Sequence, residues 1–115
     1  MASDPGFMDY VMDQIGAAGR VEFRKMFGEY AVYCDSKVVA LVCDNQLYLK
    51  PTPAGRALLG TAIEAPPYPG AKPYFLIQAR LDDRAAVTEL IRCTAEALPL
   101  PRPKKSAAAR RANAS

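Results

Sequence analysis

The chain has 115 residues, of which 50% are apolar and 23% are charged, and its formal net charge is +3. Residues 102–115 carry five bases and no acid, so residues 1–101 hold ten bases against twelve acids. This composition is typical of one globular domain with a mildly acidic body. It argues against a disordered chain and against an extensive basic surface for nucleic acid.

The chain has no histidine and three cysteines, Cys34, Cys43 and Cys93. Without histidine, His-containing zinc sites, the Ser-His-Asp triad and the Cys-His pair are excluded. The cysteines are odd in number and none belongs to a C-x-x-C pair, which predicts buried, reduced thiols. We therefore expect no catalytic residues, no bound metal and no cofactor.

Neither a membrane span nor an export signal is expected. The longest apolar run, Val38 to Cys43, is far shorter than the ~20 residues that cross a bilayer. Acidic residues occupy the N-terminal stretch at Asp4, Asp9 and Asp13, where a signal peptide would carry basic residues before a long apolar segment. We therefore expect a cytoplasmic protein.

The first predicted element is a helix over about residues 5–17. Phe7, Val11 and Ile15 recur four residues apart, which places one apolar stripe on the helix. Pro5 lies in its first turn, where a proline is well tolerated. This helix is expected to pack its stripe against a core.

Four strands are predicted next, because short runs rich in β-branched and aromatic residues are separated by turn residues. They span residues 21–24, 30–34, 37–43 and 46–50. The dipeptides Asp35-Ser36 and Asp44-Asn45 tolerate the positive φ of tight hairpins, so the strands form an antiparallel meander. The near-continuous apolar run 38–43 is expected to be its central strand. In the first strand, Val21 and Phe23 alternate with charged residues, as in a half-buried strand.

Residues 51–60 are predicted to form a short helix. Thr52 would be its N-cap and Pro53 its first residue. Leu58 and Leu59 would both pack inward, before a glycine ends the helix.

The remaining elements are a strand over residues 74–80 and a last helix that Asp82 or Asp83 caps. The expected buried face of that helix consists of Val87, Leu90, Ile91, Thr94 and Leu98. Helices and strands do not alternate regularly along the chain, which predicts the α+β class. We expect a single domain over residues 1–101, in which N-terminal, middle and C-terminal helices pack on one antiparallel sheet.

The stretch "LYLKPTPAGR" is a first candidate site. Lys50 closes a strand and Arg56 lies on a short helix whose N-terminal amides could attract an anion. The alternative is a well-capped helix with no ligand. No glycine-rich phosphate loop accompanies it.

The stretch "EAPPYPGAKPYFLI", residues 64–77, is a second candidate. Its four prolines stiffen the connection and Gly70 allows a turn. One interpretation is a structural strap that carries the chain across the sheet and delivers Tyr74 into its strand in a fixed register. The other is a docking loop on which Tyr68, with Lys72 beside it, contacts a partner.

The C-terminal stretch is the third candidate. Its five bases are Arg102, Lys104, Lys105, Arg110 and Arg111. A basic, disordered arm can hold nucleic acid weakly through phosphates alone, and it can equally serve as a solubilising end.

Four blocks of the sequence resemble one known family. "RKMFGEYAVYCD", "LVCDNQLYLKPTPAGR", "EAPPYPGAKPYFLI" and "LPLPRPKK" are similar, in order and spacing, to the N-terminal domain of the TfoX/Sxy family. The resemblance runs from about Phe7 to Lys105 and implies an α+β domain with a curved antiparallel sheet. The matching residues are candidates for fold or partner contacts: Gly28, Tyr30, Lys50, Pro51, Arg56, Pro67, Tyr68, Gly70, Lys72 and Pro73.

The resemblance also implies a regulatory function. Family members act as transcriptional coactivators alongside the cyclic-AMP receptor protein at competence promoters, and they carry a second, helical domain that has no counterpart in this sequence. We therefore expect a stand-alone, non-enzymatic module that binds a protein, with a transcription factor as the expected partner. Weak nucleic-acid binding through residues 102–115 and small-anion binding stay open as alternatives, and the sequence leaves open whether the chain forms a homodimer.

Overall fold

The computed structural model describes residues 3–26 and 28–99. In chain order its elements are α1 (Pro5–Ile15), the 3-10 helix η1 (Gly16–Ala18), β1 (Val21–Met26), β2 (Glu29–Cys34), β3 (Lys37–Cys43), β4 (Gln46–Leu49), α2 (Pro53–Leu59), β5 (Glu64–Ala65), β6 (Tyr74–Ile77), η2 (Ala79–Asp82) and α3 (Arg84–Ala97). The predicted α-helices and strands follow one another in the expected order; β5 and the two 3-10 helices are additions, and the strand predicted over residues 74–80 ends at Ile77. The tail bases lie outside the described residues.

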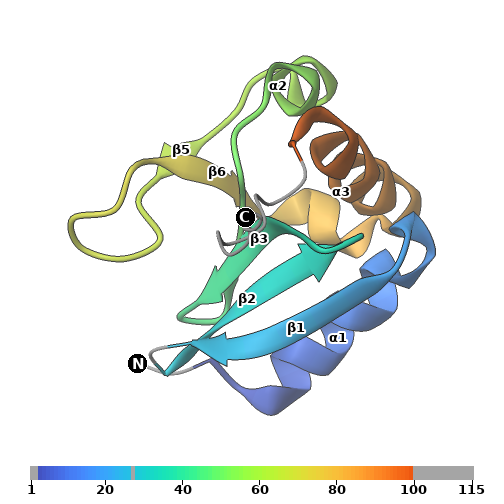
Figure 1. Ribbon diagram of the computed structural model, residues 1–115. Helices are drawn as coiled ribbons and strands as arrows, with labels where there is room; N and C mark the ends of the chain where they lie inside the picture. Colours follow the sequence, from blue (N-terminus) through green and yellow to red (C-terminus); the bar gives the residue numbers. More distant parts are fainter. Residues whose placement is uncertain (1–2, 27, 100–115) are drawn as a thin grey trace, which may run out of the picture.

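The strands form one six-stranded antiparallel sheet in the order β1-β2-β3-β4-β6-β5. The predicted α+β class is therefore confirmed, and β3 is an interior strand as expected. Helices α1 and α3 lie together on one side of the sheet (Figure 1). Across residues 3–26 and 28–99, no helix is long and apolar enough to cross a membrane.

Two tight turns set the register of the central strands. Asp35 and Ser36 adopt φ of 52° and 70°, and Asp44 and Asn45 adopt φ of 53° and 57°. Left-handed conformations at both central residues match the twist of a two-residue hairpin. The predicted hairpins at these dipeptides are confirmed.

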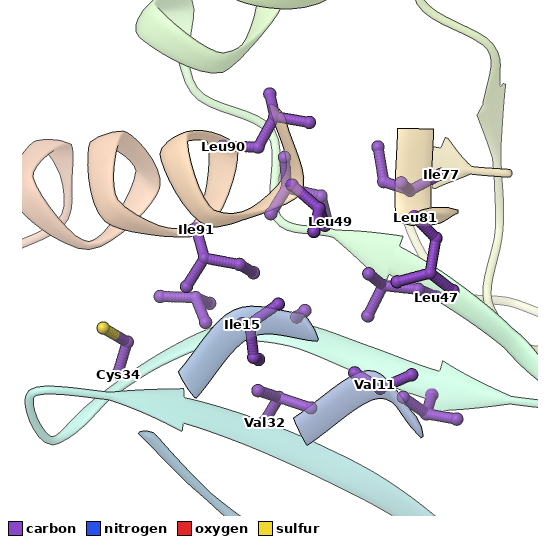
Figure 2. Close-up of a cluster of buried hydrophobic side chains, with 14 of the residues drawn as sticks. Val11, Ile15, Val32, Cys34, Leu47, Leu49, Ile77, Leu81, Leu90 and Ile91 are labelled. Atoms are coloured by element: carbon purple, nitrogen blue, oxygen red, sulfur yellow. The ribbon is translucent and has the colours of Figure 1, made fainter. Parts of the chain in front are cut away.

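The main core lies between the helices and the sheet. Figure 2 shows Val11 and Ile15 of α1 close to Val32 of β2, with Ile91 of α3 near Ile15 and Leu90 of α3 farther along the same core. All five side chains are 0–1% exposed. The apolar stripe of the first helix and the buried face of the last one are thus confirmed. Cys34, Cys43 and Cys93 are free and buried, as predicted.

Helix α2 differs from prediction in one residue. Thr52 caps it through an Oγ1 atom that accepts a hydrogen bond from the Gly55 N–H at 3.0 Å, as expected. Leu59 is buried in the core, whereas Leu58 is 44% exposed, so the expectation that both pack inward was wrong. Successive helical residues point about 100° apart, and a single turn against the core buries only one of them.

Strand β1 also differs from prediction. Val21 is half-buried, but the other five residues are exposed, and the exposed fraction of Phe23 is 41%. The strand lies at one edge of the sheet, where it has a neighbour on one side only. The alternation of apolar and charged residues in β1 therefore does not correspond to one buried and one exposed face.

Candidate protein-binding surface

The face of the sheet that α1 and α3 leave uncovered is apolar. Alternate residues of a strand point to opposite faces, and this second face carries its own cluster of buried side chains. Its buried members are Ala31, Leu41, Cys43 and Tyr48, and its half-buried members are Tyr33, Val38, Ala65, Tyr74 and Leu76. The register aligns Ala31, Leu41, Tyr48 and Leu76 in one row across β2, β3, β4 and β6.

The proline-rich segment forms a loop beside this face. Glu64 and Ala65 pair with Phe75 and Tyr74, so the chain leaves β5 and returns in β6 as a hairpin at the edge of the sheet. The segment does not cross the sheet, and that part of the strap prediction was wrong. Tyr74 does begin its strand, in register with Ala65. Figure 1 shows this loop, in yellow, on the opposite side of the molecule from α1 and α3.

The tip of the loop is a tight turn. The Ala71 N–H donates to the Tyr68 carbonyl at 3.0 Å, and Gly70 adopts a φ of 86°. Proline at the second position and glycine with positive φ at the third are the residues that a type II turn requires. Pro67 is buried, whereas Tyr68 is 55% exposed. The loop therefore presents an aromatic ring on a stiff support.

Two adjoining hollows lie between the loop and the sheet. The first, of about 380 Å³, is lined by Met26, Glu29, Tyr30, Leu41, Cys43 and Tyr68. The second, of about 480 Å³, is lined by Glu29, Cys43, Asp44, Tyr48, Pro66, Pro67, Tyr68 and Pro69. We call the two together the open-face groove. Tyr68 belongs to both hollows, so the loop and the apolar sheet face build one continuous surface.

Glu29 is the charged residue common to both hollows. Its carboxylate accepts hydrogen bonds from the Ser3 N–H and the Asp44 N–H, each at 2.9 Å. Partial burial opposes ionisation, but these donors outweigh it and lower the pKa of Glu29. Glu29 thus joins the N-terminal segment to the β3–β4 turn at the end of the groove. No local sequence signal marks this residue, because its partners are 26 and 15 positions away.

We predict that Glu29→Gln lowers the free energy of unfolding by about 1–2 kcal/mol at pH 7, because an amide accepts fewer and weaker hydrogen bonds than a carboxylate. A lowered folded-state pKa stabilises the fold above the ordinary glutamate pKa, and the effect disappears as the pH falls through the folded-state value. Urea denaturation at pH 7 and in acid should show that the difference in unfolding free energy between Glu29→Gln and wild type shrinks as the pH falls. Glu96→Gln, at an exposed position on α3, is the control. A gap that stays constant across this pH range would contradict the prediction.

Two ionisable groups of the open-face groove are shifted toward their neutral forms. Burial raises the pKa of the Cys43 thiol and of the Tyr48 phenol. A protonated thiol is a poor nucleophile. The groove can therefore offer apolar contact, aromatic rings and the carboxylates of Glu29 and Asp44, which suits recognition rather than covalent chemistry.

The cations proposed for an anion site are not brought together. Arg56 forms an ion pair with Glu64 at 2.7 Å, and its guanidinium lies 5.1 Å from the centre of the Phe75 ring. A hollow of about 430 Å³ beside it is lined by Pro51, Thr52, Pro53, Arg56 and Phe75. Neither Lys50, which is half-buried, nor Lys72, which is exposed, belongs to this lining. Arg56 is thus positioned to cover the core and to hold the start of β5.

The candidate structural residues lie in turns and connections. Gly28 follows β1 with a φ of 82°, in the turn before β2. Pro51 joins β4 to the capped start of α2, and Pro73, which is exposed, directly precedes β6.

We predict that Gly70→Val destabilises the fold by about 1–3 kcal/mol, because a β-branched residue is strained at positive φ. A Cβ atom at this position would meet nothing within 4 Å, so the cost is one of backbone strain rather than of collision. Gly70→Asn is the matched control, since asparagine tolerates this conformation better. Thermal and urea unfolding would measure both variants. If Gly70→Val unfolds like the parent, the turn has no structural role.

The fold and the groove together define a class of protein: a small α+β domain whose antiparallel sheet has helices on one face and an apolar groove on the other. The chain belongs to the TfoX N-terminal domain family, which it matches over residues 13–98. It is also 44% identical, over 106 residues and 92% of each chain, to an uncharacterized 12.7 kDa protein encoded in the trpE 5' region of Spirochaeta aurantia.

Proposed function

We propose that this chain is a non-enzymatic regulatory module that binds a protein partner through the open-face groove. The observation that carries the proposal is the pairing of an apolar sheet face with a stiff loop bearing Tyr68, whose ring is 55% exposed. Exposed aromatic side chains beside apolar pockets are the residues that most often dominate protein–protein binding energy. A loop that is already rigid loses little conformational entropy on binding.

The chemistry of the groove supports a binding function over catalysis. The Glu29 carboxylate already accepts two backbone hydrogen bonds, and burial raises the pKa of the Cys43 thiol. General acid–base catalysis needs a group whose pKa lies near the working pH and whose proton is free to move. Neither group meets that requirement.

Family membership supports a partner in transcription. The regulatory members of this family act at competence promoters, so we propose a cytoplasmic transcription factor, such as a cyclic-AMP receptor protein, as the partner. A fold alone does not assign a function, and the partner must therefore be tested directly. The direct test is binding of the purified chain to the cyclic-AMP receptor protein of the same organism, at physiological salt.

We predict that Tyr68→Ala weakens that binding about 30-fold, which corresponds to the ~2 kcal/mol of an aromatic anchor, and leaves the melting temperature unchanged. Tyr10→Ala is the matched control, because Tyr10 is a 39% exposed tyrosine on α1, outside the groove. Binding would be measured by calorimetry or surface plasmon resonance. Equal binding by Tyr68→Ala and wild type would rule out the groove, and no binding by wild type would rule out this partner.

A further inference from the structure

Strand β1 is an open edge of the sheet. It spans six residues, pairs with β2 on one side and is the first strand in the sheet order. Phe23 and Met26 are 41% and 42% exposed on it. An edge strand of this length presents unpaired backbone N–H and C=O groups that can pair with another strand. Proteins often protect such edges with charged residues, and the arrangement of the charges in β1 therefore decides what the edge can accept.

The charges of β1 alternate in sign on one face. Glu22 lies opposite Tyr33 of β2, and the Arg24 guanidinium lies 5.2 Å from the centre of the same tyrosine ring. Both side chains therefore flank Tyr33 on one face of the sheet. Among residues 3–26 and 28–99, no ion pair involves Glu22, Arg24 or Lys25.

Two copies of one strand can pair antiparallel only in a few registers. Residues that lie opposite each other in such a pair share a face of the sheet. In a symmetric pair, one residue of the strand must therefore lie directly opposite its own copy, with the two-fold axis passing between the two. Centring the pair on Glu22, Arg24 or Lys25 sets a like charge against itself, which is destabilising. Centring it on Phe23 sets each Glu22 opposite an Arg24, gives two complementary charge pairs and places the two Phe23 rings together.

We propose that two copies of this chain form a dimer by antiparallel pairing of their β1 strands, centred on Phe23. The two sheets then join into one, and the exposed Phe23 rings cover each other. Only five residues of each strand pair in this register, so the interface is small. It belongs to the size class of transient complexes, and we expect a dissociation constant in the micromolar range.

The oligomeric state of the full chain tests the proposal. We expect the mass from sedimentation equilibrium to rise from monomer to dimer between about 5 and 500 µM, as expected for an interface of this size. Glu22→Arg and Arg24→Glu should each weaken the dimer at least tenfold, because each creates two like-charge pairs. The double variant should restore the dimer. Glu96→Arg, an exposed charge reversal outside β1, should dimerise like wild type.

A covalent trap tests the register itself. Phe23→Cys should give a disulfide-linked dimer under mild oxidation, since opposite residues of antiparallel strands have Cα atoms within disulfide range. Glu22→Cys is the matched control: its two copies lie two residues apart in this register, beyond that range, and should not link. The native thiols are buried and contribute little background. A chain that is monomeric at 500 µM, a double variant that stays monomeric, or equal linking of both cysteine variants would overturn the proposal.

Discussion

Phe75→Ala is expected to lower the free energy of unfolding by about 3–5 kcal/mol, the usual cost of removing a buried phenylalanine ring. Phe75 is 1% exposed and is one of the largest fully buried side chains in the described residues. It lies on β6 between Leu49 of β4 and Glu64 of β5, and the Arg56 guanidinium covers its ring. The ring therefore links the main core, α2 and the start of the proline-rich loop.

The measurement is urea denaturation followed by circular dichroism. Because domains of this size are stable by only about 5–15 kcal/mol, Phe75→Ala should also melt far below wild type. Tyr68→Ala removes a ring of similar size from a 55% exposed position, and it should change stability by less than about 0.5 kcal/mol. Similar losses of stability in Phe75→Ala and Tyr68→Ala would contradict the expectation that burial determines the cost of removing the ring.

Local signals explain which elements the sequence predicts well. The dipeptides Asp35-Ser36 and Asp44-Asn45 tolerate the positive φ that two-residue hairpins require, and the structure has it at all four residues. Thr52 followed by a proline is a helix start, and its Oγ1 atom accepts the capping hydrogen bond. Each of these signals acts over two to four residues, so a single sequence suffices to detect it.

Long-range pairing explains what the sequence does not predict. Strand β5 has two residues, and it is a strand only because Glu64 and Ala65 meet β6 ten residues later. Glu29 likewise acquires its role from Ser3 and Asp44, which the fold brings to it. Arg56, by contrast, was a candidate on local grounds, and the fold pairs it with Glu64. No local pattern encodes these partners.

One sequence pattern nevertheless bears on the groove. The run 38–43 is apolar at consecutive positions, whereas a strand with one solvated face alternates apolar and polar residues. The helices account for Val39 and Val42, which are buried in the main core. Leu41 and Cys43 point to the other face, and both line the open-face groove. Both side chains are only 7% exposed, so neighbouring side chains of the same chain already account for most of their burial.

Two neighbouring leucines of α2, Leu58 and Leu59, differ in exposure and should differ in their contribution to stability. Leu59→Ala should destabilise the fold by about 2–4 kcal/mol, because the side chain is 7% exposed and packs in the main core. Leu58→Ala makes the same chemical change one residue earlier, at a side chain that is 44% exposed. It should change stability by less than about 0.5 kcal/mol, since little apolar area leaves the core and alanine favours the helix.

The two variants serve as each other's control, because composition, helix and size of the deletion are the same. Urea denaturation of both would give the difference directly, and it should be at least about 1.5 kcal/mol, the smallest gap that the two expected ranges allow. Equal losses would mean that α2 also packs its Leu58 side, as the sequence pattern predicts. A larger loss for Leu58→Ala would mean that α2 is rotated about its axis. In that case the contacts of Arg56 with Glu64 and Phe75 would change as well, because Arg56 lies on this helix.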